Sequence, residues 1–325
     1  MNANQSARVI VHAIDPSPML ERLGQRHPSV DAVGCSTYAG LASSLDAFRP
    51  NIFYGIRFDG TQRFPREALL GEAAPDWISI GGSGVDHLGR WDPGRIQVTN
   101  SAGVAASMMA EYMLGGFLHF TLDIGGLERD KSNQIWQSDR LMVPLWGKTL
   151  LIIGLGQTGR ALAARAKAMG MKVLGTRARP KETANVDEVY TANQLGELLP
   201  RADFIAVCVP LLESTRGLVD AQAFARMKPG VVLADVSRGG VVEGEALIDA
   251  LNKNHIGGAV LDVFETEPLP TEHELWQVEN VLISPHCSSV FDGWEMASFD
   301  MFCDNLDNFL EGKPLSNIVN PDLGY

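Results

Sequence analysis

The segment Leu150-Leu-Ile-Ile-Gly154-Leu-Gly156-Gln-Thr-Gly159-Arg-Ala-Leu-Ala163 decides the fold class of this chain. It joins a short apolar run of strand type to an alanine-rich run of helix type through glycines spaced GxGxxG. The first glycine allows a tight turn, the second lets a pyrophosphate approach the main chain, and the third permits close packing of helix on strand. The anion would lie at the N-terminus of the helix. A glycine-rich turn without a ligand is the alternative. The cofactor-binding residues expected here are Gly154, Gly156, Gln157, Thr158 and Gly159.

Strand-type and helix-type runs alternate along the rest of the chain. Several apolar runs are continuous, as in parallel strands that are covered on both faces. Repeated alternation of strand and helix predicts an α/β protein built on parallel, doubly wound sheets with right-handed connections. Strands are predicted at residues 8–14, 52–56, 77–80, 96–99, 150–154, 172–175, 204–209, 231–236, 259–263 and 281–284, and helices at 159–169, 221–227 and 244–251.

The length of 325 residues predicts two domains, because single cores stop growing at ~250–300 residues. A strand ends near Asn100, and a long apolar helix is predicted from Ala105 to about Arg129. The last helix, 292–310, is expected to fold back onto the first hundred residues. The predicted domains are therefore residues 1–103 with 293–325, a substrate domain, and residues 104–292, a dinucleotide-binding domain.

The segment 130–147 carries Trp136, Leu141 and Trp146 but has no helical or strand period. Apolar side chains on an irregular segment need a partner surface. Two interpretations are open, namely a contact between two subunits and packing on the segment's own domain.

Composition restricts the class of partner. With 27 basic and 39 acidic residues the formal charge is −12, which argues against nucleic-acid and anionic-membrane partners. No apolar run approaches the ~20 residues of a membrane helix, and residues 1–7 lack the apolar core of a signal peptide. Four cysteines without a CxxC pair are typical of reduced thiols in a cytoplasmic protein, and no histidine pattern suggests a metal site.

Arg177 stands eighteen residues after Gly159, where NAD-binding domains carry an acidic residue for the ribose hydroxyls. Together with Arg179 it could hold a 2′-phosphate by bidentate, charge-assisted hydrogen bonds. NADP(H) is therefore the preferred cofactor, and NAD(H) is possible. The alternative is a solvated basic turn in an enzyme that accepts both cofactors.

Three residues suited to acid–base and anion chemistry follow predicted strands, at the edge where open α/β sheets bind ligands. They are Arg238, Glu267 and His286. Singly, each has a structural alternative: a surface arginine, a loop glutamate, and a histidine with a satisfied hydrogen bond. Their presence beside a dinucleotide-binding motif favours the chemical interpretation.

The chain resembles the D-isomer-specific 2-hydroxyacid dehydrogenases in an ordered set of blocks that spans nearly its whole length. The resemblance implies a flavodoxin-like substrate domain, a Rossmann-type cofactor domain, a cleft between them and, in most members, a homodimer. The blocks are residues 82–86, 99–104 with 110–111, the glycine segment, 237–240 with 246–247, and 262–269 followed by 280 and 285–286.

The same resemblance implies that Arg238, Glu267 and His286 are catalytic. Reduction of a 2-keto acid places a hydride on the carbonyl carbon and leaves an alkoxide that must gain a proton. A histidine suits this step because its ordinary pKa lies near working pH. Glu267 would fix its tautomer and favour its charged form, and Arg238 would hold the substrate carboxylate.

Further contacts are expected from the resemblance. Main-chain N–H groups of Ser83 and Gly84 would bind the substrate carboxylate, the alternative being a tight turn needed for packing. Asp262 would receive the nicotinamide amide. Apart from the resemblance, Arg57, at the end of the predicted strand 52–56, either lines the site or is a solvated arginine. Cys287, next to His286, is either a reactive thiol or, as the favoured interpretation, a small buried side chain. The remaining cofactor contacts expected are Val209, Pro210, Thr215, Val236, Ser237 and Ser288.

Together these features predict an NADP(H)-preferring reductase that converts small 2-keto acids, of the glyoxylate or hydroxypyruvate type, to D-2-hydroxy acids with His286 as general acid. One alternative is a phosphoglycerate-type dehydrogenase. Another is a nucleotide-sensing, corepressor-like binding protein with little turnover.

Overall fold

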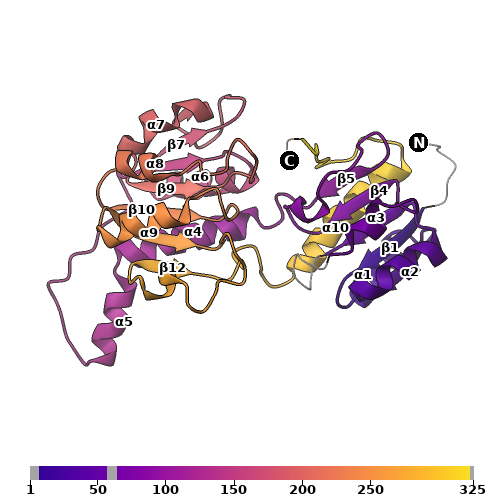
Figure 1. The fold of residues 1–325 in the computed structure, drawn as a ribbon, viewed down its shortest axis with the longest axis horizontal. Helices are drawn as coiled ribbons and strands as arrows, with labels where there is room; N and C mark the ends of the chain where they lie inside the picture. Colours follow the sequence, from indigo (N-terminus) through magenta and orange to yellow (C-terminus); the bar gives the residue numbers. More distant parts are fainter. Residues whose placement is uncertain (1–6, 57–63, 323–325) are drawn as a thin grey trace. The chain divides into compact units, whose positions relative to one another are not determined.

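The computed structural model describes residues 7–56 and 64–322, which form two compact units (Figure 1). Unit 1 is Met1–Val104 with Phe291–Tyr325, and unit 2 is Ala105–Val290. Arg57 lies outside the described residues. Among the helices of the described ranges, none combines the length and the apolar character needed to cross a bilayer.

Unit 1 is built on a five-stranded parallel sheet with the strand order β2-β1-β3-β4-β5. This order is that of the flavodoxin-like fold, so the expected fold of the first domain is confirmed. The strands are β1 (Arg8–His12), β2 (Asp31–Cys35), β3 (Ile52–Gly55), β4 (Trp77–Ile80) and β5 (Gln97–Asn100); the helices are α1 (Ser17–Arg26), α2 (Tyr38–Phe48), α3 (Arg66–Leu70), α10 (Trp294–Leu310) and the 3₁₀ turn η1 (Asp86–Leu88).

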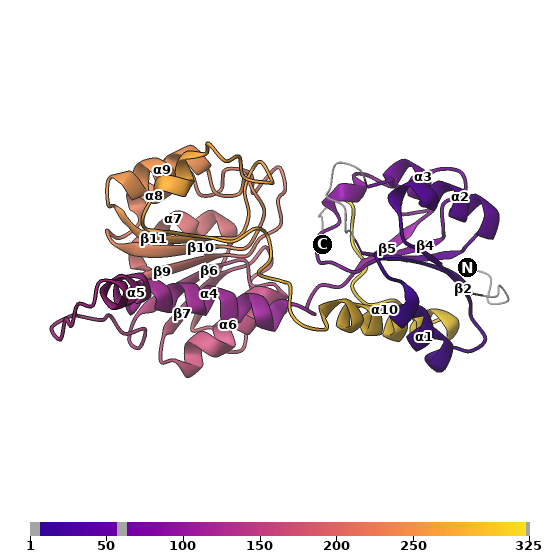
Figure 2. The same ribbon diagram turned by 90° about the horizontal axis from the view of Figure 1, so that it is seen from below.

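Helix α10 completes unit 1 from the far end of the chain. It lies with α1 on one face of the sheet, while α2 and α3 cover the other face (Figure 2). The ring of Phe302 packs 5.0 Å from that of Tyr54 and 5.2 Å from that of Trp77, centroid to centroid, and all three side chains are buried. The prediction that the last helix folds back onto the first hundred residues is therefore confirmed.

Unit 2 is a seven-stranded parallel sheet with the order β12-β11-β10-β9-β6-β7-β8. Counted from its own first strand, this is the Rossmann order 3-2-1-4-5-6 extended by one strand, as expected. The strands are β6 (Thr149–Ile153), β7 (Lys172–Thr176), β8 (Glu188–Tyr190), β9 (Phe204–Val207), β10 (Val231–Asp235), β11 (Ile256–Leu261) and β12 (Val281–Ile283).

Helices cover both faces of this sheet, and each face has its own apolar core (Figure 2). Helices α4 and α6 pack on one face, and α7, α8 and α9 pack on the other. The helical segments of unit 2 are α4 (Ala106–Thr121), α5 (Ile124–Ser132), α6 (Gln157–Ala168), α7 (Leu195–Leu198), α8 (Ala221–Arg226), α9 (Gly244–Asn252) and the 3₁₀ turns η2 (Ala192–Gln194), η3 (Leu199–Arg201) and η4 (Glu274–Gln277).

Two features of the fold differ from the sequence-based expectation. The prediction of a single helix from Ala105 to about Arg129 is wrong, because α4 ends at Thr121. Asp123 adopts a left-handed conformation with φ of 47°, and its side chain accepts a hydrogen bond from the main-chain N–H of Gly126, so it caps α5 instead. Strands β2 and β8 were not predicted; both are edge strands, and neither carries a continuous buried apolar run.

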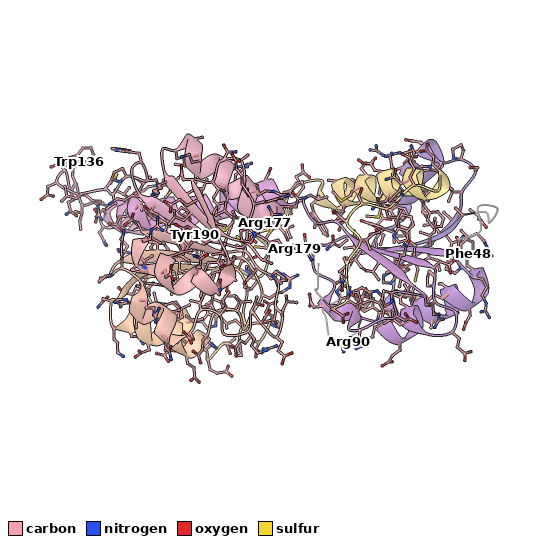
Figure 3. All side chains as sticks on the ribbon, turned by 90° about the horizontal axis from the view of Figure 1, so that it is seen from above. Phe48, Arg90, Trp136, Arg177, Arg179 and Tyr190 are labelled. Atoms are coloured by element: carbon pink, nitrogen blue, oxygen red, sulfur yellow. The ribbon has the colours of Figure 1, made fainter. Side chains whose placement is uncertain are left out.

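The segment that follows α5 is irregular and leaves its largest apolar side chains uncovered. Trp136 is 94% exposed, Leu141 92% and Trp146 71%, and Figure 3 shows Trp136 far out on this segment. The segment is anchored to the residues around α5, because Arg140 forms ion pairs with Asp123 and Asp130 and the N–H of Val143 donates to the carbonyl of Thr121 at 2.8 Å. These three side chains therefore do not pack on their own unit.

Candidate active site

The glycine turn between β6 and α6 has the geometry of a phosphate cradle. Gly154 has φ of 103°, and a Cβ there would lie 2.7 Å from the carbonyl oxygen of Cys208. A Cβ on Gly159 would lie 2.2 Å from the carbonyl oxygen of Gly154, so helix and strand touch at this point. A Cβ on Gly156 would meet open space, and no side chain caps α6. The open N-terminus of α6 fits a dinucleotide pyrophosphate.

Gln157 and Thr158 form the first turn of α6. The Gln157 side-chain oxygen accepts a hydrogen bond from Arg160 at 2.7 Å, and the Thr158 hydroxyl donates to the sulfur of Met109 at 3.7 Å. The main-chain N–H groups of this first turn have no acceptor within the helix and are therefore available to an anion.

Arg177 and Arg179 follow β7 directly, at the end of the second strand of the Rossmann order (Figure 3). The N–H of Arg177 donates to the carbonyl of Tyr190 at 2.9 Å, which holds the turn against β8. The Arg177 side chain is half-buried and that of Arg179 is exposed. The described part of the chain gives neither guanidinium an ion pair, so both are available to an anion.

His286 and Glu267 form a hydrogen-bonded pair. The Nδ1 atom of His286 lies 2.8 Å from Oε2 of Glu267, and Oε1 of Glu267 accepts from the main-chain N–H of Phe264 at 3.0 Å. Partial burial alone would raise the pKa of Glu267, but the hydrogen bonds from His286 and Phe264 and the charge of Arg238 outweigh it, so that pKa is lowered. Glu267 is thus a hydrogen-bond acceptor at neutral pH, so Nδ1 of His286 carries the proton of this hydrogen bond. The other ring nitrogen, Nε2, is left for a different partner.

Arg238 follows β10 and lies close to this pair. Its guanidinium donates to the carbonyl of Ser237 at 2.8 Å, and its charge acts on Glu267. The next residue, Gly239, packs so tightly that a Cβ would lie 2.0 Å from the carbonyl oxygen of Phe264. The loops that carry Arg238 and Glu267 therefore touch through their main chains, and the structure brings all three predicted catalytic residues to the carboxyl edge of the sheet of unit 2.

Asp262 is buried at the start of the loop that follows β11. Its carboxylate is 1% exposed and accepts hydrogen bonds from the N–H and the hydroxyl of Ser288, from the N–H of Cys287 and from the hydroxyl of Ser284. These donors belong to the loop that carries His286. The oxygens expected to receive a nicotinamide amide, and the Ser288 hydroxyl expected to contact the cofactor, are engaged with each other inside the protein.

A second buried carboxylate, Asp235, ends β10 and was not among the predicted site residues. It accepts from the N–H of Ser237 at 2.9 Å and from the Ser237 hydroxyl at 2.5 Å. Burial, helped by the charge of Asp262, raises its pKa to about 7 although the Ser237 bonds oppose the shift. Asp235 therefore binds its proton more tightly in the folded chain than in the unfolded chain. Its contribution to the free energy of unfolding is lost as pH rises toward 7. A charged residue ending an apolar run was the available signal.

The remaining predicted cofactor contacts lie on loops at the same edge. Thr215 closes the loop after β9, since its hydroxyl donates to the carbonyl of Pro210 at 2.6 Å and accepts from the N–H of Leu212 at 2.7 Å. Val209 and Pro210 are half-buried beside it, whereas Val236 is buried in the core under the sheet edge. Their cofactor contacts stay predictions.

Ser83 and Gly84 lie in unit 1, in the turn after β4. The carbonyl of Ser83 accepts from the side chain of Asn100 at 2.6 Å, and the carbonyl of Gly82 accepts from the N–H of Ser101 at 3.0 Å. The turn is tied down through its carbonyls, and Gly82 and Ser83 are exposed. Their role in substrate binding stays a prediction.

Cys287 is exposed, so the expectation of a buried side chain is wrong. Its thiol is nonetheless not activated, because partial desolvation of the sulfur and the nearby charge of Asp262 raise its pKa.

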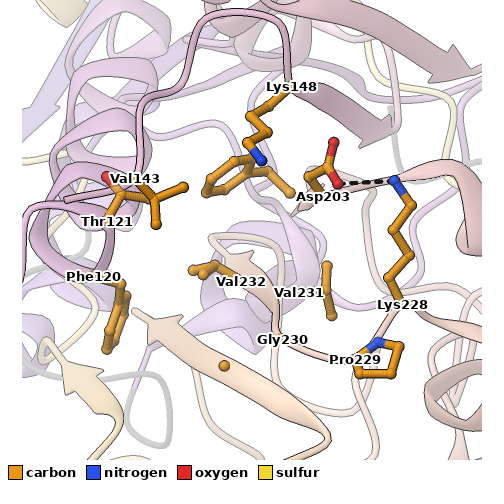
Figure 4. A pocket seen from close by; sticks show the side chains of 12 residues that line it. Phe120, Thr121, Val143, Lys148, Asp203, Lys228, Pro229, Gly230, Val231 and Val232 are labelled. Carbon is orange, nitrogen blue, oxygen red and sulfur yellow. Dashed lines mark hydrogen bonds and ion pairs between the residues drawn. The ribbon is translucent and has the colours of Figure 1, made fainter. Parts of the chain in front are cut away.

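A separate cavity of about 300 Å³ opens at the amino edge of the same sheet (Figure 4). Its polar lining includes Lys148, Asp203 and Lys228, which precede β6, β9 and β10, and the ammonium of Lys228 pairs with the carboxylate of Asp203 at 2.8 Å. Because the glycine turn, Arg238, Glu267 and His286 all follow carboxyl ends of strands, this cavity is not part of the candidate active site.

Comparison with known proteins gives consistent matches. Residues 114–288 match the family model of the D-isomer specific 2-hydroxyacid dehydrogenase NAD binding domain. A glyoxylate reductase of Korarchaeum cryptofilum is 31% identical over 269 residues, which cover 80% of this chain and 81% of that enzyme. A D-3-phosphoglycerate dehydrogenase of Methanocaldococcus jannaschii is 33% identical over 248 residues; the match covers 75% of this chain and about half, 47%, of that relative.

The whole fold also has a solved counterpart. The structure of an NADPH-dependent glyoxylate/hydroxypyruvate reductase from Sinorhizobium meliloti, in complex with NADP and sulfate, superposes with a TM-score of 0.82 at 25% identity. The match covers 99% of this chain and all of that one.

Two glycine substitutions separate the ligand-binding role of the turn from its packing role. We expect Gly156→Ala to fold with an unchanged melting temperature, because its Cβ meets open space, but to bind NADPH at least tenfold more weakly, since the methyl occupies the phosphate approach. Gly159→Ala places a Cβ 2.2 Å from a carbonyl oxygen and should lower the melting temperature by several degrees. Calorimetry and NADPH titration measure both. Normal NADPH affinity in a folded Gly156→Ala variant would contradict the cradle.

Proposed function

Because the chain belongs to the D-isomer-specific 2-hydroxyacid dehydrogenase family of NAD(P)-dependent oxidoreductases, we propose that it reduces small 2-keto acids of the glyoxylate or hydroxypyruvate type to D-2-hydroxy acids. The observation that carries this proposal is the 2.8 Å contact between His286 Nδ1 and Glu267 Oε2 beside Arg238. A histidine oriented by a carboxylate is the arrangement that a proton-coupled hydride transfer requires.

The chain's own residues divide the chemistry as follows. The glycine turn would hold the pyrophosphate of the reduced dinucleotide, whose nicotinamide would supply the hydride. His286 donates the proton from Nε2 to the oxygen of the substrate carbonyl as negative charge develops there. Glu267 keeps the imidazole in the Nδ1–H tautomer and fixes its orientation. Arg238 holds the substrate carboxylate and polarises the carbonyl with a permanently charged, planar group.

We propose NADP(H) as the preferred cofactor, on the basis of Arg177 and Arg179 after β7. The S. meliloti relative is described as NADPH-dependent and was solved with NADP, which supports the same preference here. NAD(H) is the second choice, because the ribose hydroxyls have no carboxylate partner at position 177.

The phosphoglycerate-type alternative is favoured by the match to the M. jannaschii enzyme, although this chain spans only about half of that relative. A panel of glyoxylate, hydroxypyruvate and phosphohydroxypyruvate, each with NADPH and with NADH, separates the two substrate classes. A nucleotide-sensing binding protein would bind NADPH and oxidise it with none of the three.

We also propose a homodimer in which the segment around Trp136, Leu141 and Trp146 contacts a second copy. Exposed side chains on an anchored segment support it, because such side chains gain most from burial against a partner. A cytoplasmic location is proposed on the four free cysteines, two of which are not buried.

Replacing the proton donor tests the reaction. We expect His286→Ala to lower kcat by roughly 10²–10⁴-fold, the usual scale of a general acid, with NADPH affinity nearly unchanged. His119→Ala, on α4, is the matched control and should keep the parent rate. Stopped-flow NADPH oxidation measures both. Turnover at the parent rate in His286→Ala would remove the histidine from the mechanism.

Reversing the charge after β7 tests the cofactor preference. Arg177→Asp should raise the Kd for NADPH about 10–100-fold, because it removes charged hydrogen bonds worth about 1.5–3 kcal/mol. The Kd for NADH should stay the same or fall. Arg226→Asp, on α8, carries the same charge change and should affect neither. Equal NADPH affinity in Arg177→Asp and the parent would show that this turn does not contact the 2′-phosphate.

A charge on the exposed segment tests the dimer. We expect the parent chain to sediment as a dimer and Leu141→Arg to shift toward the monomer, because burial of the new charge is costly. Ile14→Arg, at a side chain 67% exposed in unit 1, is the control and should stay dimeric. A parent that sediments as a monomer at micromolar concentration would contradict the proposal.

A further inference from the structure

A single buried carboxylate holds the loop that carries His286 from both sides. Asp262 follows β11 directly, and its own N–H donates to the carbonyl of Asp235 at 3.1 Å, so its main chain is fixed to the neighbouring strand. The side chain is 1% exposed. A carboxylate at this position is therefore a rigid acceptor, attached to the central sheet of unit 2.

Every hydrogen bond given to this carboxylate comes from residues that flank His286. On the chain before it, the Ser284 hydroxyl donates to Oδ1 at 2.5 Å. On the chain after it, the Cys287 N–H donates to Oδ1 at 2.8 Å, and Ser288 donates to Oδ2 through its hydroxyl at 2.5 Å and through its N–H at 3.2 Å. Both sides of the loop are thus tied to one acceptor.

The conformation of His286 explains why such a tie is needed. Its φ of 53° lies in the left-handed region, which residues other than glycine rarely adopt and which persists only where the surrounding structure enforces it. Its N–H also donates to the carbonyl of Ser284 at 3.0 Å, which closes a tight turn. This turn aims the imidazole at Glu267, so a relaxed loop would move Nδ1 away from its 2.8 Å partner.

Tyr112 extends the network to helix α4. Its hydroxyl lies 2.6 Å from the hydroxyl of Ser284. Because Ser284 has one proton and gives it to the carboxylate of Asp262, Ser284 must accept from Tyr112. Burial raises the pKa of Tyr112 to about 12, helped by the charge of Asp262, so the tyrosine keeps the proton that it donates. Donors thus run in one direction, from Tyr112 through Ser284 to Asp262.

We propose that Asp262, supported by Ser284 and Tyr112, is a positioning residue that holds His286 in its catalytic orientation. The inference rests on the proposed function, since it assigns a purpose to the geometry of the proton donor. None of the three residues needs to touch the substrate for this role.

A positioning role of Asp262 and a contact to the nicotinamide amide affect different constants. A contact to the nicotinamide amide would be lost as NADPH affinity. A positioning role would be lost as kcat, since displacing a catalytic group by about 1 Å can cost 10²-fold. We expect Asp262→Asn, which turns one acceptor oxygen into a donor facing donors, to lower kcat by roughly 10²-fold with the Kd for NADPH within about threefold of the parent.

Substitutions that remove only one hydrogen bond keep the test valid if Asp262→Asn folds poorly. Ser284→Ala removes one tie and should lower kcat by about tenfold, the value of one such hydrogen bond, and Tyr112→Phe should cost less than that. Asp203→Asn is the matched control, because Asp203 also accepts a main-chain N–H, from Thr149 at 2.8 Å, but at the amino edge of the sheet. It should leave kcat unchanged.

A double-mutant cycle identifies the target of the network. If Asp262 acts through His286, then Asp262→Asn or Ser284→Ala added to His286→Ala should cause no further loss of kcat. A further loss of the same size as in the parent, or a rise in the Kd for NADPH without a loss of kcat, would overturn the inference. Failure of the proposed function would appear differently, as unchanged turnover in His286→Ala itself.

Discussion

All seven strands in the sheet of unit 2 run parallel, and this constraint determines where chemistry can occur. Each loop that leaves a strand emerges at the same edge, so residues far apart in sequence meet there. The glycine turn follows β6, Arg177 follows β7, Arg238 follows β10, Asp262 follows β11 and His286 follows β12. The phosphate cradle, the basic turn and the catalytic residues are therefore consequences of one topology, and the cavity at the amino edge stands apart from them.

The acidic groups at this edge differ in how deeply they are buried and in which partners they have. Asp235 and Asp262 are buried beneath the loops and are satisfied by Ser237 and by the donors around His286. Glu267 is less buried, and its lowered pKa follows from hydrogen bonds with His286 and the Phe264 N–H and from the charge of Arg238. The buried carboxylates hold segments of the main chain in place, and the partly exposed groups transfer protons and bind anions. This division follows from the cost of burying an unpaired charge.

Much of this edge could be predicted from the sequence, because its signals are local. The continuous apolar runs and the GxGxxG spacing led to the Rossmann-type sheet, and Arg238, Glu267 and His286 were singled out from their places after strands. Edge strands β2 and β8 have no comparable pattern, and the break at Asp123 depends on one side-chain cap. The partners of Asp262 lie 22 to 26 residues away, so only the folded chain reveals that its carboxylate serves the histidine loop.

The most direct test is a crystal structure of the protein with NADP and oxamate, an unreactive analogue of a 2-keto acid. We expect Nε2 of His286 and the guanidinium of Arg238 to contact the analogue within hydrogen-bond reach, ~2.6–3.2 Å, while Nδ1 stays on Glu267 and the flanking loop stays on Asp262. An analogue bound elsewhere, or an imidazole turned away from Glu267 in that complex, would contradict the account.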